Sequence, residues 1–152
     1  MAAARPVVFD TSVYVAAIRG GPASEPARLV RLRLPRTHLA APVAAELQAG
    51  VLDAGGRRAV AAFVRAARRV GRLVTPAFAS WLRAGEAMAA IRRSEPNLAS
   101  KLPRLWNDLL IVLSATQIGA TVVSANRDDF ELVRRYVSFD LVVAEDHRGQ
   151  SA

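Results

Sequence analysis

"VVFDTSVYV" occupies residues 7–15 and places a carboxylate, Asp10, at the end of an apolar run. The hydroxyl residues Thr11 and Ser12 follow directly, and then the apolar pattern resumes. This order predicts a buried strand that ends at an acid and is followed by the start of a helix. An acid at this position either caps the helix or forms one wall of a metal site. Acids at matching positions elsewhere in the chain decide between these two interpretations.

The rest of the chain continues this alternation of short apolar runs and longer segments with helical spacing. Short Val-rich runs bounded by Pro, Gly, Asp or Thr predict buried strands at residues 6–9, 38–41, 72–75, 120–124 and 140–144. Helical spacing predicts helices at residues 24–34, 42–56, 57–71 and 76–93, from about Trp106 and from about Asp128. Strands that alternate with helices predict an α/β fold of three layers, with a mostly parallel central sheet flanked by helices.

Some details of the helical segments are specific enough to test. The glycines at residues 55–56 are predicted to end the helix that precedes them. Trp81, Met88 and Ile91 share a helix and are predicted to face the core. Residues 94–104 are polar and contain proline, so they are predicted to form a loop.

Length and composition indicate one globular domain, predicted to span residues 1–145, with a flexible tail over 146–152. The longest uncharged run, residues 109–126, contains Ser, Thr, Gln and Gly and predicts a buried helix and strand, not a membrane span. The start lacks the apolar core of a signal peptide, and the absence of cysteine is compatible with the cytoplasm, the predicted location. The net charge of +8, from 20 Arg and one Lys, favours polyanions or an acidic protein as partners.

Several polar residues are expected to meet Asp10 at one edge of the sheet. Asn126, Asp128 and Asp129 directly follow the predicted strand 120–124. Because the carboxyl ends of parallel strands share an edge, these side chains are expected near Asp10. Asp128 is interpreted as solvated.

Two further acids stand on predicted helices. Asp108 directly precedes the apolar run LLIVL, and the alternative to a site role is an acid that caps a helix N-terminus. Glu46 lies between Ala45 and Leu47, and a carboxylate among such residues must reach solvent or find a charged partner. From the residues alone, both roles stay open for Asp108.

The chemistry of these acids depends on their number. Carboxylates gathered at one edge repel one another unless a cation neutralises them. Without Cys or His nearby, oxygen ligands suit Mg²⁺ or Mn²⁺ and not Zn²⁺. One or two such ions can activate a water molecule and stabilise the leaving oxygen of a phosphodiester. His38 and His147 are the only histidines and neither is placed beside a nucleophile, which disfavours a Ser–His–acid hydrolase.

Three segments carry a family resemblance: VVFDTSVYVAAIRG (7–20), HLAAPVAAELQAG (38–50) and WNDLLIVLSATQIGATVVSANRDDFELV (106–133). In order and spacing they resemble the motifs of PIN-domain ribonucleases, above all the VapC-type toxins of bacterial toxin–antitoxin pairs. The likeness extends from about Val7 to Val143. It implies a PIN-like α/β fold and endonucleolytic cleavage of RNA that depends on Mg²⁺ or Mn²⁺ and leaves a 5′-phosphate and a 3′-hydroxyl. It also implies a cognate VapB-type antitoxin and a homodimer.

The resemblance assigns roles by position. It places the family's first acid on Asp10, its helix acid on Glu46 and its third acid on Asp108, all as metal ligands. The small hydroxyl after the first acid falls on Thr11 or Ser12, where the family implies that it orients a metal-bound water or a phosphate.

The fourth position departs from the commonest pattern of the family. Many members have an Asp shortly after the fourth strand, where this chain has Asn126, with Asp129 three residues further on. An amide oxygen can coordinate but adds no charge, so a second metal should bind more weakly. Asp129 either completes the catalytic site by binding the metal through water or caps the following helix. Ser124 stands where Thr often occurs and is interpreted as a contact to the substrate phosphate.

Two other functions stay open at this stage. Asn126 in place of an acid motivates a catalytically weak module that binds RNA or an antitoxin without cleavage. A PIN-like nuclease of housekeeping RNA processing shares the chemistry but has no antitoxin. The arginines within residues 57–72 are interpreted as a solvated face, with a grip on RNA or the antitoxin as the alternative.

Overall fold

A five-stranded parallel sheet forms the centre of the computed structural model, which describes residues 3–144. Its strands are β1 (Val7–Phe9), β2 (Thr37–Ala40), β3 (Leu73–Val74), β4 (Thr121–Ser124) and β5 (Leu141–Val143). They lie in the order β3-β2-β1-β4-β5, and every neighbouring pair is parallel. The five predicted strands and the parallel sheet are confirmed. The predicted tail over residues 146–152, with His147, lies outside the described residues.

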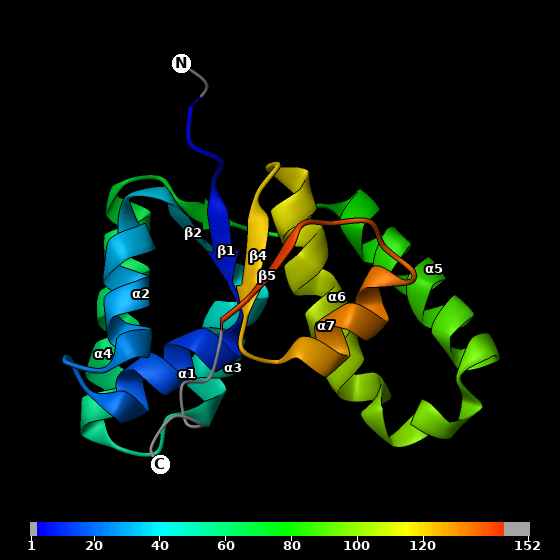
Figure 1. Cartoon of the computed structure of the whole chain (residues 1–152), viewed down its shortest axis with the longest axis horizontal. Coiled ribbons are helices and arrows are strands. Elements are labelled where there is room, and N and C mark those ends of the chain that lie inside the picture. Colours follow the sequence, from blue (N-terminus) through cyan, green and yellow to red (C-terminus); the bar gives the residue numbers. More distant parts are fainter. Residues whose placement is uncertain (1–2, 145–152) are drawn as a thin grey trace, which may run out of the picture.

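Helices cover both faces of this sheet. Within residues 3–144 the α-helices are α1 (Thr11–Gly20), α2 (Glu25–Arg33), α3 (Ala41–Gly50), α4 (Ala54–Arg69), α5 (Phe78–Ser94), α6 (Leu102–Gln117) and α7 (Arg127–Arg134). Two 3₁₀ helices, η1 (Leu34–Arg36) and η2 (Pro96–Lys101), precede β2 and α6. Figure 1 shows α2 and α4 on one side of the strands and α5, α6 and α7 on the other. The predicted three-layer α/β architecture is confirmed.

The core lies where β1 and β4 are covered on both faces. Val8, Phe9 and Val122 are completely inaccessible to solvent, and Leu109–Ala115 of α6 is buried throughout. Strands that are buried on both faces read as unbroken apolar runs, which is why VVF and TVVS identify them in the sequence. Each large apolar side chain in such a place contributes about 1.5–3 kcal/mol to stability. None of the described helices is both long and apolar enough to cross a membrane.

The predicted helix stop at residues 55–56 is wrong. α3 already ends at Gly50, and α4 begins at Ala54, so both glycines lie in the first turn of α4. The Asp53 carboxylate accepts a hydrogen bond from the Gly56 N–H at 2.6 Å and thereby caps the new helix. A good N-cap residue outweighs the weak helix propensity of the glycines that follow it.

The predicted loop over residues 94–104 is also wrong, because Ser94 belongs to α5 and helical structure resumes at Pro96. Pro96–Lys101 forms η2, and α6 begins at Leu102, four residues before the expected start at Trp106. Pro103 fits because a first helical turn tolerates proline. Asp108 therefore lies in the second turn of α6, beyond the reach of the unpaired N–H groups, and the capping interpretation of Asp108 is wrong.

The predicted core face of α5 is correct for two of three residues. Met88 and Ile91 are buried, whereas the Trp81 residue is 50% exposed. α5 forms the outermost part of its layer and packs mainly against α6, so one face stays in solvent. The period of apolar residues does not reveal this, because an exposed tryptophan at helical spacing looks like a core residue.

Candidate active site

The carboxyl edge of the sheet holds Asp10, as the first residue after β1. The Asp10 N–H donates to the Val123 carbonyl of β4 at 3.0 Å, which places its side chain beside the end of that strand. There the Ser124 hydroxyl donates to Asp10 Oδ2 at 3.0 Å, and the Ser12 hydroxyl donates to Oδ1 at 2.5 Å. Asp10 is 5% exposed, and each oxygen of its carboxylate thus accepts a hydrogen bond from a hydroxyl group.

Asp10 is the N-cap residue of α1, but its carboxylate makes no capping hydrogen bond with the helix. The Val13 N–H, in the first turn of α1, lowers the pKa of Asp10, with an effect that ranks after those of the Ser12 and Ser124 hydroxyls. Burial raises the pKa of Asp10 to about 6, and repulsion from Glu46 adds to this, while hydrogen bonds from Ser12 and Ser124 lower it. Asp10 is therefore a buried acid held in the ionisable range near neutral pH, which capping does not require.

Glu46 reaches the same edge from α3. Its residue is exposed, and its carboxylate accepts a hydrogen bond from the Thr11 hydroxyl at the start of α1. The acid on an apolar helix thus reaches solvent, one of the two outcomes expected for it, and its partner is a hydroxyl group instead of a charged side chain. Thr11 and Ser12 have different tasks, because Thr11 holds Glu46 and Ser12 holds Asp10.

Asp108 projects from the buried middle of the fold. It is 7% exposed, and its Oδ2 atom is buried with no hydrogen-bond partner among the described residues. Burial is the largest cause that raises the pKa of Asp108 to about 8; repulsion from Asp129, Asp10 and Glu46, in that order, contributes to the same rise, and Arg104 opposes it. The structure thus brings the four predicted acids near enough to one another for each of the other three to act on Asp108.

Asn126 caps the start of α7, and its side chain also contacts the carboxylate of Asp129. The Asn126 Oδ1 atom accepts from the Asp129 N–H at 3.5 Å, and its Nδ2 donates to Asp129 Oδ2 at 2.9 Å. The Asn126 N–H in turn donates to the Ser124 hydroxyl at 2.8 Å, which links this cap to Asp10. Asp129 is buried, whereas Asp128 is exposed, as predicted.

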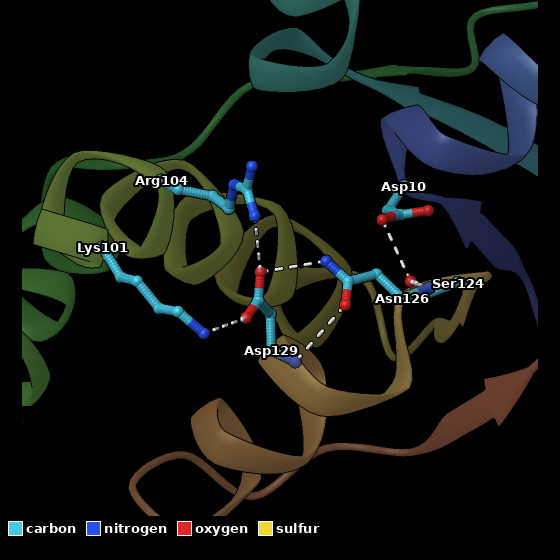
Figure 2. A network of polar contacts seen from close by, with 6 residues as sticks. All are labelled: Asp10, Lys101, Arg104, Ser124, Asn126 and Asp129. Atoms are coloured by element: carbon cyan, nitrogen blue, oxygen red, sulfur yellow. Dashed lines mark hydrogen bonds and ion pairs between the residues drawn. The ribbon is translucent and has the colours of Figure 1, made fainter. Parts of the chain in front are cut away.

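Two cations that the sequence interpretation missed accompany Asp129. Lys101 Nζ lies 4.0 Å from Asp129 Oδ1, and Arg104 Nη1 lies 3.6 Å from Oδ2 (Figure 2). Both residues fell in the segment that was predicted to be a loop. Once α6 is known to begin at Leu102, Arg104 stands one turn before Asp108, and that spacing is the signal that could have identified it.

The model of the PIN domain family matches residues 7–136. This chain belongs to the PIN domain family. The family is one of nucleases that generally use divalent metal ions. The fold is similar to one chain in the crystal structure of VapBC2 from Rickettsia felis bound to a DNA fragment from their promoter, with a TM-score of 0.64 and 20% sequence identity. That similarity covers 91% of this chain and 98% of the other. A search of curated proteins finds no significant match.

The donor set of this PIN domain fits a hard divalent cation. Asp10, Glu46, Asp108 and Asp129 supply only oxygen atoms, and oxygen ligands suit Mg²⁺ or Mn²⁺. The buried Oδ2 atom of Asp108 has no hydrogen-bond partner within residues 3–144, and it is the kind of atom that a bound cation satisfies. Among residues 3–144 no three His, Cys, Asp or Glu side chains are arranged so that they could hold an ion as they stand.

Proposed function

We propose that this PIN domain is a metal-dependent endoribonuclease that acts in the cytoplasm as a VapC-type toxin. Asp108 carries the proposal. It lies in the second turn of α6, too far along to cap the start of that helix. It is buried beside other acids, and its Oδ2 atom has no hydrogen-bond partner in the described part of the chain. A purely structural acid in such a place lowers the stability of the fold, because a buried carboxylate without a partner is costly. A cation that binds these acids removes that cost.

Asp10, Glu46 and Asp108 are the proposed ligands of Mg²⁺ or Mn²⁺. When bound, such an ion activates a water molecule and stabilises the leaving oxygen of a phosphodiester. The hydroxyl groups of Ser12 and Ser124 hold both oxygens of Asp10, so the orientation of this carboxylate is set by the protein. Partners of this kind behind a ligand commonly fix its rotamer and tune its basicity.

The proposed product ends are a 5′-phosphate and a 3′-hydroxyl, which form when water attacks the phosphorus atom and the bond from phosphorus to the 3′ oxygen breaks. The positive charge of the chain supports a polyanionic substrate, because each phosphate contact releases counterions and adds affinity. Thr11, which is only partly buried, is the proposed contact to the phosphate near the ligands. The sequence-based expectation that Ser124 makes such a contact is wrong, because Ser124 is completely buried and its hydroxyl donates to Asp10.

A VapB-type antitoxin and a second copy of the chain are the proposed partners. Support comes from the family and from the solved structure named VapBC2, one chain of which shares this fold. A small DNA-binding protein with an acidic tail, encoded directly upstream, is expected to bind the chain and block cleavage. Size-exclusion chromatography with light scattering on the separate and co-expressed proteins measures both associations. A monomeric chain that does not bind the protein encoded upstream would favour a housekeeping nuclease.

A binding module without catalysis is the second candidate. Its motivation is Asn126, whose carbonyl oxygen accepts from the Asp129 N–H and caps α7, so the fourth position adds no charge to the site. If the chain is such a binding module, calorimetry is expected to detect RNA binding at millimolar Mg²⁺, and gels of the same samples are expected to show intact RNA. For the nuclease, the same samples show product.

The test of the proposed nuclease uses a labelled tRNA or total-RNA pool with Mg²⁺, Mn²⁺ or chelator. The wild type is expected to cleave only with metal, and Asp10→Asn is expected to lose at least a hundredfold in rate while keeping its circular dichroism spectrum. Asp128→Asn is the matched control, because Asp128 is an exposed acid at the same edge of the sheet. Equal cleavage by Asp10→Asn and the wild type would contradict the assignment.

A further inference from the structure

We propose that Arg104 and Lys101 bind an RNA phosphate at the mouth of the acidic site, and that Asp129 holds these two cations in place instead of coordinating the metal. This inference rests on the proposed RNA cleavage and names how the substrate is held there. It gives Asp129 a role that differs from both alternatives left open by the sequence, which were metal ligation through water and capping of the following helix.

The two cations are exposed, whereas the carboxylate that they share is buried. The side chains of Arg104 and Lys101 are 66% and 50% exposed, and that of Asp129 is 6% exposed. Figure 2 shows Arg104, Lys101 and Asn126 approaching the Asp129 carboxylate from different directions. The cations are therefore anchored at their tips but accessible along one side, as a phosphate contact requires.

The anchoring is loose enough to leave their donors available. The distances to Asp129 of 3.6 Å from Arg104 and 4.0 Å from Lys101 exceed those of hydrogen bonds. Within residues 3–144 neither cation donates a hydrogen bond. A guanidinium has five N–H donors in a planar fork that matches a phosphate, and an ammonium has three. An incoming phosphate can thus gain charge-assisted hydrogen bonds without competing for existing ones.

The local charge balance also calls for cations here. Asp10, Glu46 and Asp108 repel one another and would repel a phosphate that approached them. Arg104 and Lys101 share a single carboxylate, so one positive charge is left over beside these acids. Arg104 is close enough to Asp108 to favour its ionised form, which places the guanidinium within electrostatic reach of the proposed ligands.

Each oxygen of the Asp129 carboxylate already has a polar or charged side chain near it. Oδ2 accepts from Asn126 Nδ2 at 2.9 Å and faces Arg104, and Oδ1 faces Lys101. A metal ion on Asp129 would stand directly beside two cations, which disfavours it. A purely structural pair is the alternative, but ion pairs that involve such exposed cations contribute little to stability.

RNA binding tests the cations without turnover. Fluorescence anisotropy with a labelled RNA in chelator is measured over a series of salt concentrations, and gels check that the RNA stays intact. Arg104→Ala and Lys101→Ala are each expected to weaken binding and to reduce the slope of log affinity against log salt by about 0.7, one phosphate contact. Arg104→Lys is expected to keep the slope but bind more weakly than the wild type, because it loses the fork. Arg135→Ala is the matched control, since its side chain is equally exposed and pairs with Glu95.

Metal binding tests Asp129 separately. Titration with Mn²⁺ is expected to give Asp129→Asn an affinity within about threefold of the wild type. Asp108→Asn is expected to lose more than tenfold in affinity, which corresponds to roughly 1.4 kcal/mol or more of binding free energy. An equal loss in both variants would make Asp129 a ligand and overturn the inference. If Asp129→Asn unfolds, the slopes of the Arg104 and Lys101 variants decide.

Cleavage by the wild type in Mg²⁺ is measured on the same preparation. Cleavage together with unchanged salt slopes in both cation variants overturns the inference and leaves the proposed nuclease intact. A folded wild type that neither cleaves nor binds RNA overturns the proposed function and, with it, the inference.

Discussion

The two serine hydroxyls on Asp10 have a measurable consequence for its ionisation. Removing the Ser124 hydroxyl takes away a donor that stabilises the ionised carboxylate, so Ser124→Ala is expected to raise the pKa of Asp10 above its value of about 6. NMR titration of the metal-free protein with ¹³C-labelled Asp measures this shift. Ser114→Ala is the matched control, because Ser114 is equally buried but donates to the Leu110 carbonyl. A similar pKa of Asp10 in all three proteins would show that Ser124 does not tune it.

Asp108 predicts a pH dependence of stability in the absence of metal. Its pKa of about 8 in the folded chain lies above the unfolded value of 3.8, so the folded state binds more protons between these values. The stability contributed by protonated Asp108 is complete below about pH 4 and is lost as pH rises towards 8. The free energy of unfolding, measured with urea in chelator, is expected to fall between pH 5 and pH 8 by on the order of 3 kcal/mol more in the wild type than in Asp108→Asn.

The control for this pH dependence is Asp128→Asn, an exposed site whose loss should leave the wild-type slope unchanged. Parallel pH profiles for the wild type and Asp108→Asn would contradict the assignment of a raised pKa to Asp108. Adding millimolar Mn²⁺ to the wild type is expected to restore stability at pH 8, because a cation neutralises the ionised carboxylates.

Among the helices, α4 begins with Asp53 as its N-cap, although the two glycines in its first turn predict a helix end. The Asp53 carboxylate accepts from the Gly56 N–H, so Asp53→Ala is expected to lower the free energy of unfolding by about 1 kcal/mol. Asp53→Asn retains a capping oxygen and is expected to stay close to the wild type. Urea denaturation of the three proteins measures the difference. An Asp53→Ala variant as stable as the wild type would mean that packing alone sets the start of α4.

The strands could be predicted from the sequence, whereas several helix ends could not. Val7–Phe9 and Thr121–Ser124 are short, apolar and buried on both faces, so their pattern is local and unambiguous. The start of α6 at Leu102 depends on η2, a short 3₁₀ helix of mixed polar and apolar residues that has no periodic signature. Trp81 is exposed because of where α5 packs, which no local pattern records.

The candidate site was predictable in its acids but not in its partners. The order of strands brings Asp10 and Ser124 together, and the family resemblance supplied Glu46 and Asp108. The contacts that distinguish this site come from side chains on separate elements. Lys101 ends η2 and meets Asp129 of α7 only in the folded chain. Contacts of this kind depend on packing and not on spacing.

At the scale of the whole molecule, positive charge is concentrated in one segment of the sequence. Residues 25–72 contain ten Arg, no Lys and three acids, a net charge of +7 out of +8 for the chain. The segment comprises α2 to α4 and the residues around them, and α2 and α4 lie on one side of the sheet (Figure 1). Such a distribution attracts a polyanion to one side of the molecule.

Two exposed arginines of α4 test this long-range attraction. Arg65→Ala combined with Arg69→Ala is expected to weaken RNA binding and to reduce the salt slope by up to about 1.4, two phosphate contacts. Arg92→Ala with Arg93→Ala on α5 removes the same charge from the other side of the sheet and is the control. Equal slopes for the two double variants would assign the arginines of α4 to a solvated face.

Titration of the metal-free wild type and Asp108→Asn with Mn²⁺ at pH 7 tests the proposed metal site most directly. The predicted result is saturable binding by the wild type, with release of protons as the raised pKa of Asp108 falls, and a loss of more than tenfold in affinity in Asp108→Asn. Isothermal calorimetry in two buffers of different ionisation enthalpy measures both quantities. Equal Mn²⁺ affinity in the two proteins, or no binding by the folded wild type, would contradict a metal site at this edge of the sheet.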